Sequence, residues 1–127
     1  MGKLRHVAFI VEDPEASAAF FEKAFGMARV GSGERVCRLS DGVISIALMQ
    51  KDTDEEQVGI DHFGIWVDDL EAGAQLVSDA GAKTLRYQAP QPDVFYEAKF
   101  ETPDGITFDL SHTGWPGAVK DPEEGRD

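Results

Sequence analysis

IDHFGIWV at residues 60–67 repeats the pattern of LRHVAFIV at residues 4–11, and a histidine holds the third position of each run. His6 and His62 stand 56 residues apart (62 − 6). Each run is followed by an acidic start signal, an alanine-rich segment and a glycine. An Asp-Gly turn and an apolar run then complete each copy, with the turns at positions 41–42 and 104–105. The repeat predicts two copies of one structural unit that pack together.

The composition is that of a soluble globular domain, with 42% hydrophobic and 28% charged residues in a chain of 127. No run approaches the roughly 20 apolar residues of a membrane span. The first residues also lack the pattern of a secretory signal. The single cysteine, Cys37, cannot form an internal disulfide, which favours a reducing compartment. We therefore expect a cytoplasmic protein.

The net charge of −12 argues against two classes of partner. A negative field repels nucleic acid and anionic membrane, so we expect neither. A small-molecule substrate fits better, because a bound metal ion can reverse the local sign of the field.

The first copy predicts a strand, a helix and three further strands. Asp13 and Pro14 are typical of a helix N-cap and first helical position, and Gly26 is typical of a helix end. Helical spacing places Ala18, Phe21, Ala24 and Phe25 on one apolar face. Strands are expected at residues 4–11, 27–30, 35–39 and 43–49.

The second copy predicts the same order. A helix is expected from Asp68-Asp69 to about Ala80, ended by Gly81. Strands are expected at residues 60–67, 83–87, 94–101 and 106–111. We therefore expect one domain over residues 1–127, with unit one at 4–50, a linker at 51–58, unit two at 59–112 and a C-terminal arm at 113–127. Trp115 is expected to anchor that arm on its own fold or on a partner subunit.

Strand alternation sorts the side chains onto two faces. The bulky Val7, Phe9 and Val11 predict the face under the helix, which leaves His6 on the other face. In their own strands, His62 and Asp109 also point away from the face of the bulky apolar residues, and so share the face of His6. Two histidines and one carboxylate on one face are a ligand set that holds a divalent metal and leaves positions open for substrate.

The chain resembles the vicinal-oxygen-chelate superfamily, which contains glyoxalases, bleomycin resistance proteins, extradiol dioxygenases, epimerases and thiol transferases. The motifs that carry the resemblance are HVAF at 6–9, DP at 13–14, FGM at 25–27, HFGIWV at 62–67 and TPDGITFDL at 102–110. The resemblance implies an α+β fold, in which tandem βαβββ units form a curved mixed sheet around a concave metal site. It also implies His6, His62 and Asp109 as the metal ligands.

The sequence departs from the family at a fourth ligand position. Matching strand faces puts this position at Ala47, and counting from the Asp-Gly turns puts it at Ile46. Neither side chain can bind a metal. A three-ligand site favours a dioxygenase-like enzyme with Fe²⁺. The alternatives are a lyase, isomerase, epimerase or thiol transferase with Mn²⁺, Ni²⁺, Zn²⁺ or Co²⁺, and a metal-free protein that sequesters a ligand.

Secondary candidates surround this set. Glu97 and Lys99 are acid–base candidates, against the alternative of an exposed, charge-paired strand face. Trp66, Thr107 and Ser111 are candidates for substrate binding. We also expect a homodimer. The sequence leaves open whether the two units pair within one chain or across the dimer.

Overall fold

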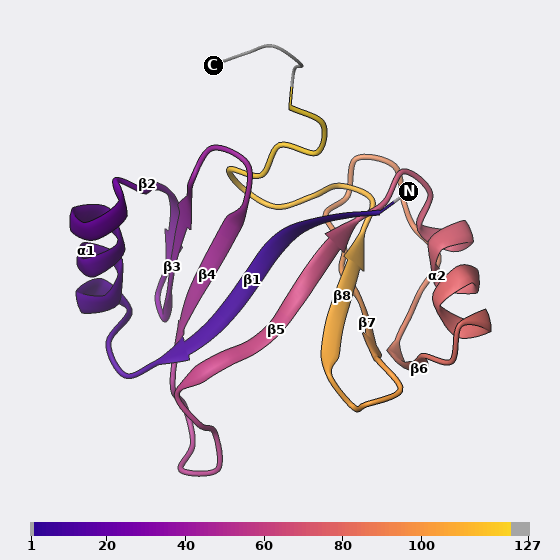
Figure 1. Cartoon of the computed structure of the whole chain (residues 1–127), viewed down its shortest axis with the longest axis horizontal. Helices are drawn as coiled ribbons and strands as arrows, with labels where there is room; N and C mark the ends of the chain where they lie inside the picture. The colour runs from indigo at the N-terminus through magenta and orange to yellow at the C-terminus, as the bar shows by residue number, and fades with distance from the viewer. Residues whose placement is uncertain (1, 123–127) are drawn as a thin grey trace.

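The computed structural model describes residues 2–122, which form one mixed sheet of eight strands with two helices (Figure 1). The strand order is β2-β3-β4-β1-β5-β8-β7-β6. Unit one contains β1 (Lys3–Val11), α1 (Pro14–Phe25), β2 (Ala28–Gly33), β3 (Val36–Ser40) and β4 (Ser45–Gln50). Unit two contains β5 (Gly59–Trp66), α2 (Leu70–Asp79), β6 (Lys83–Arg86), β7 (Ala98–Glu101) and β8 (Thr107–Ser111). The expected α+β fold of two βαβββ units is confirmed.

Helix α1 begins and ends as its sequence predicts. The carboxylate of Asp13 accepts hydrogen bonds from the backbone N–H groups of the first turn, and Gly26 adopts the left-handed conformation at the other end. Ala18 and Phe21 pack on the sheet. Phe25, expected in the core, is 64% exposed. Its ring stays at the surface beside Phe20 and Phe21, so the buried stripe of the helix is narrower than the apolar pattern suggested.

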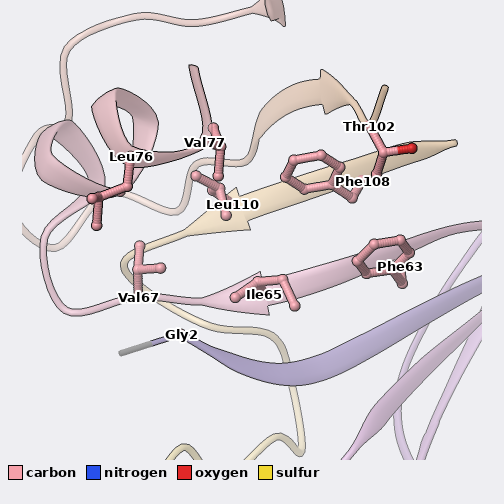
Figure 2. A pocket seen from close by; sticks show the side chains of 10 residues that line it. Gly2, Phe63, Ile65, Val67, Leu76, Val77, Thr102, Phe108 and Leu110 are labelled. Carbon is pink, nitrogen blue, oxygen red and sulfur yellow. The ribbon is translucent and has the colours of Figure 1, made fainter. Parts of the chain in front are cut away.

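Helix α2 covers the second half of the sheet less completely. Its N-cap is Asp69, and its buried residues pack on Phe100, Phe108 and Leu110. An apolar cavity of about 300 Å³ remains between α2 and strands β5 and β8. Figure 2 shows that side chains of both strands and of the helix line it.

Strand β7 begins at Ala98, later than the expected position 94. The preceding loop contains Pro90 and Pro92, which cannot donate to a strand ladder, and Asp93 with a φ of 63°. These residues keep the chain out of the sheet until the register with β8 begins at Ala98.

The two units join within one chain, because β1 pairs with β5 in antiparallel register. Val7 lies opposite Phe63 in this pairing, and both side chains pack toward the helices. His6 lies opposite Gly64, so its side chain faces the other way, onto the concave face that no helix covers. Both helices flank the outside of the curved sheet (Figure 1).

The C-terminal arm crosses from β8 back to unit one (Figure 1). Its residues 113–122 are described, and the last five residues of the expected arm lie outside the described residues. Ser40 Oγ donates to the carbonyl of Gly117 at 2.7 Å. The guanidinium of Arg5 donates to the carbonyls of Val119 and Lys120 at 2.8 Å each. Trp115 is 5% exposed, so the arm anchors on its own fold.

Within residues 2–122, neither helix is long and apolar enough to cross a membrane.

We predict that Gly73→Ala stabilises the protein by about 1 kcal/mol, because it removes glycine entropy from the interior of α2. The added methyl would meet Val67 at 3.4 Å and Leu110 at 3.6 Å, in the wall of the apolar cavity. Urea denaturation should show a higher midpoint with an unchanged slope. The control, Gly81→Ala, should lower the midpoint, because Gly81 has a φ of +107°. A lower midpoint for Gly73→Ala would contradict the prediction.

Candidate metal centre

A single row of residues runs across the middle of the sheet. Cα pairing places Ser45 beside His6, His6 beside Gly64, Gly64 beside Asp109, and Asp109 beside Lys99. Residues paired in this way share one face of a sheet. The register therefore brings side chains from both units together on the concave face.

Four side chains from this region form a compact donor cluster: His6, His62, Glu97 and Asp109. One nitrogen or oxygen atom from each lies within 4.8 Å of all the others. His6, His62 and Asp109 are the three expected ligands. Glu97 was an acid–base candidate, and the structure adds it to the donor set.

The carboxylate of Asp109 is the most buried charge of the cluster, with 1% of the residue exposed. Lys99 Nζ lies 2.6 Å from Oδ1, and His62 Nε2 lies 3.1 Å from Oδ2. Burial alone would raise the pKa of Asp109, but the hydrogen bonds from His62 and Lys99 lower it to about 2. Asp109 is therefore ionised at neutral pH and available as a ligand.

The carboxylate of Asp61 orients the ring of His62 from its Nδ1 side. His62 Nδ1 lies 2.7 Å from Asp61 Oδ2, which directs Nε2 toward Asp109. Burial alone would lower the pKa of His62, but the hydrogen bonds to Asp109 and Asp61 raise it. Such carboxylate–histidine pairs orient metal ligands in many proteins.

Sequence reasoning missed Asp61, because strict alternation sends it to the opposite face from His62. The pairing of β1 with β5 shifts there: Ala8 lies opposite His62, and Phe9 lies opposite Ile60. Asp61 is the extra residue of this bulge, and a bulge redirects the side chains next to it. A bulge leaves no clear signal in this sequence.

His6 is buried and neutral. Burial, together with the nearby charges of His62 and Arg38, lowers its pKa to about 4. Its Nδ1 is buried without a hydrogen-bond partner among the described residues. The ring of Trp115 stacks on the imidazole at a centroid distance of 4.8 Å and an angle of 9°. Neutral imidazole is the form that binds metals.

Glu97 is held by the same tryptophan. Trp115 Nε1 donates to Glu97 Oε2 at 2.6 Å. Burial is the main cause that raises the pKa of Glu97; the hydrogen bond from Trp115 opposes this rise, and the neighbouring charge of Asp109 adds to it. Sequence reasoning placed Trp115 in an anchoring arm and not in the site. Its only sequence signal is a large aromatic residue in an otherwise polar tail.

The position of unit one that corresponds to Asp109 is occupied by Ala47, because Ala47 pairs with Ala8 as Asp109 pairs with Gly64. Ile46 packs in the core with Leu39 and Leu48, whereas Ala47 pairs with Ala8 beside the concave face. The face-based alignment is therefore the right one, and unit one offers no carboxylate at that position. Glu97, just before β7, supplies the second carboxylate of the cluster instead.

The secondary candidates for substrate binding have other contacts. Ser111 is fully buried, and its Oγ accepts hydrogen bonds from the N–H groups of Thr113 and Gly114. Trp66 Nε1 donates to the carbonyl of His112 at 3.3 Å. Both therefore support the turn into the arm. Thr107 lies at the far end of β8, opposite Glu101, and is partly exposed. His112 contacts the carbonyl of Gln91 at 3.2 Å and lies outside the donor cluster.

The donor cluster fits a divalent ion in chemistry and nearly in size. Nitrogen and oxygen ligands lie about 2.0–2.2 Å from such an ion, so any two are at most about 4.4 Å apart. The limit of 4.8 Å observed here requires only a small inward movement. The unpartnered nitrogen of His6 and the oriented ring of His62 are further features of a ligand set. The apolar cavity under α2 contains no such donors and lies on the other face of the sheet.

The family described as the Glyoxalase/Bleomycin resistance protein/Dioxygenase superfamily matches residues 3–110. The chain belongs to this superfamily. A comparison with curated proteins gives no match.

Solved structures share the fold at low sequence identity. A manganese(II)-bound glyoxalase from Novosphingobium aromaticivorans is 23% identical with a TM-score of 0.71, over 98% of this chain and 44% of that longer one. Methylmalonyl-CoA epimerase from Mycobacterium tuberculosis is 20% identical with a TM-score of 0.69, over 85% of each chain. A hypothetical protein, BH1468 from Bacillus halodurans C-125, is 18% identical with a TM-score of 0.71, over 98% of this chain and 99% of that one.

We predict that Asp61→Ala weakens metal binding by about 10- to 100-fold, because His62 loses the carboxylate that orients its ring. Isothermal titration with Zn²⁺ alone measures the affinity. The matched control is Asp54→Ala, which removes the same charge from the exposed linker. Equal affinities for the two variants would show that Asp61 does not support the site.

Proposed function

We propose that this member of the superfamily is a divalent-metal-dependent enzyme that binds a small oxygen-bearing substrate on its concave face. The observation that carries the proposal is the cluster of two histidines and two carboxylates within 4.8 Å of one another. His6, His62 and Asp109 would hold the ion, and Glu97 would be the fourth donor. When bound, the ion supplies Lewis-acid stabilisation of negative charge on a substrate oxygen.

Glu97, as a fourth donor, bears on which type of reaction the site can support. A three-ligand site leaves room for a chelating substrate and for O2, which is the basis of the dioxygenase-like prediction. Four protein donors leave about two positions of an octahedron, which a chelating substrate fills by itself. The geometry therefore favours proton-transfer chemistry, as in an isomerase, epimerase or lyase, over ring cleavage by O2.

Lys99 is then the candidate for transferring a proton to or from the substrate, or for neutralising its negative charge. Its Nζ lies against Asp109 at the edge of the cluster, and its side chain is 25% exposed. The side chain is therefore accessible in part from solvent. This position suits a group that exchanges a proton with a metal-bound substrate, or that neutralises its charge.

Two cations point to an anionic substrate. Arg38 pairs with Ala47 in the sheet, as Lys99 pairs with Asp109, so both occupy equivalent positions in the two units. Arg38 is close enough to His6 to lower its pKa. In a chain of net charge −12, two cations beside one cluster favour a carboxylate or phosphate on the substrate.

We predict that His62→Ala and Asp109→Ala each abolish metal binding while the fold survives, because each removes a ligand from the donor cluster. Elemental analysis of protein purified without added metal, followed by titration with Mn²⁺, Zn²⁺, Ni²⁺, Co²⁺ and Fe²⁺, makes the measurement. His112→Ala is the matched control, because His112 lies outside the cluster. Wild-type protein with less than about 0.1 metal per chain and no tight rebinding would overturn the proposal.

A separate experiment tests whether the reaction is proton transfer or ring cleavage by O2. Metal-loaded protein in D2O is incubated with methylmalonyl-CoA and with small 2-oxo and 2-hydroxy acids, and NMR follows exchange of the proton next to the carbonyl group. Catechols are tested in parallel with an oxygen electrode. We expect proton exchange without oxygen uptake. Oxygen uptake that depends on a catechol would instead support the dioxygenase-like branch.

A metal-free ligand-sequestering protein is the second candidate. The observation in its favour is that Lys99 already compensates the buried charge of Asp109. The elemental analysis distinguishes the two, because only the enzyme requires the metal. The cytoplasmic location, the homodimer and the absence of nucleic-acid or membrane partners stay predictions from the sequence.

A further inference from the structure

Trp115 comes from the C-terminal arm, yet it touches the donor cluster at two points. Its ring stacks on His6, and its N–H donates to Glu97. His6 belongs to unit one, and Glu97 belongs to unit two. One side chain thus fixes a donor from each half of the sheet.

Gly64 makes the space for this ring. It lies between His6 and Asp109 in the row across the sheet. A Cβ atom at position 64 would lie 2.6 Å from Cζ2 of Trp115 and 2.9 Å from Cβ of His6. The indole therefore fills the gap that the missing side chain leaves.

The arm fits just as closely on both sides of Trp115. A Cβ on Gly114 would lie 2.4 Å from the ring of Trp66. A Cβ on Gly117 would lie 2.7 Å from Cβ of Ser40. Both glycines have positive φ angles, at 76° and 81°. The backbone is thus shaped to bring the indole to one fixed place.

We propose that Trp115 is a positioning residue of the metal centre, which holds the Glu97 carboxylate and the His6 ring in the orientation that binds the ion. The inference rests on the proposed function. The indole N–H donates to Oε2 of Glu97, so Oε1 would be the oxygen that binds the ion. For Glu97 this is the role that Asp61 has for His62: a neighbour that fixes the orientation of a ligand.

The test is a titration of four proteins with Zn²⁺ alone: wild type, Trp115→Phe, Glu97→Gln and the double variant. Trp115→Phe keeps an aromatic ring beside His6, and it removes the N–H donor together with part of the indole that fills the gap at Gly64. We expect it to lower affinity at least tenfold in the wild-type background and less than twofold in the Glu97→Gln background. A purely structural role would produce the same loss in both backgrounds, and that result would overturn the proposal.

Trp66→Phe is the matched control, because it removes the other of the two tryptophans, whose N–H donates to the carbonyl of His112 and not to the cluster. Because the ring of Trp66 packs against Gly114 of the arm, Trp66→Phe measures the effect of loosening the arm, and its Zn²⁺ affinity should fall by less than that of Trp115→Phe. It also makes Trp115 the single tryptophan, whose emission should be quenched as Co²⁺ binds beside His6. This readout does not depend on Trp115→Phe folding. An unquenched Trp115 in protein that binds Co²⁺ would overturn the inference.

The outcomes separate the two proposals. Wild-type protein that binds no metal overturns the proposed function and this inference with it. If the wild type and Trp115→Phe bind Zn²⁺ with equal affinity, the proposed function stands. The positioning role of Trp115 is then overturned.

Discussion

The buried carboxylate of Asp109 is the constraint around which the concave face is arranged. An ionised carboxylate in the interior is unstable without partners, at a cost of several kcal/mol. Lys99 and His62 supply two hydrogen bonds to it, and Asp61 in turn holds His62. Each of these contacts requires one particular register of β5, β8 and β7. The contacts that compensate the buried charge therefore exist only in this register.

The same cluster explains the departure of unit one from the repeat. A carboxylate at Ala47 would add a second buried charge on the face of His6, beside Arg38. The cluster instead takes its second carboxylate from Glu97, next to Lys99 along the chain. The negative charges are thus concentrated in unit two, where the compensating lysine lies. Unit one contributes a neutral histidine and a small side chain.

Much of the fold could be predicted from the sequence because its signals are local. Asp13, Pro14 and Gly26 set the ends of α1 through hydrogen bonds within a few residues. Alternation in β1, β5 and β8 assigned His6, His62 and Asp109 to one face, and the structure brings all three together. Alternation did not find Asp61, because a bulge breaks the period of two at that point. Helical spacing did not predict that Phe25 lies at the surface, because the width of a buried stripe depends on what the helix packs against.

The sequence by itself determined the repeat, the family and the face of each strand, since these follow from backbone geometry and from residues near one another in the chain. Only the tertiary structure decided that the two units pair through β1 and β5, that Ala47 and not Ile46 shares the face of His6, and that Glu97 and Trp115 lie beside the expected ligands. Those features depend on contacts between residues far apart in the chain. Trp115 and Gly64 lie far apart in the chain and belong to no common sequence pattern. The periodicity of the sequence therefore cannot predict that the indole of Trp115 fills the space above Gly64.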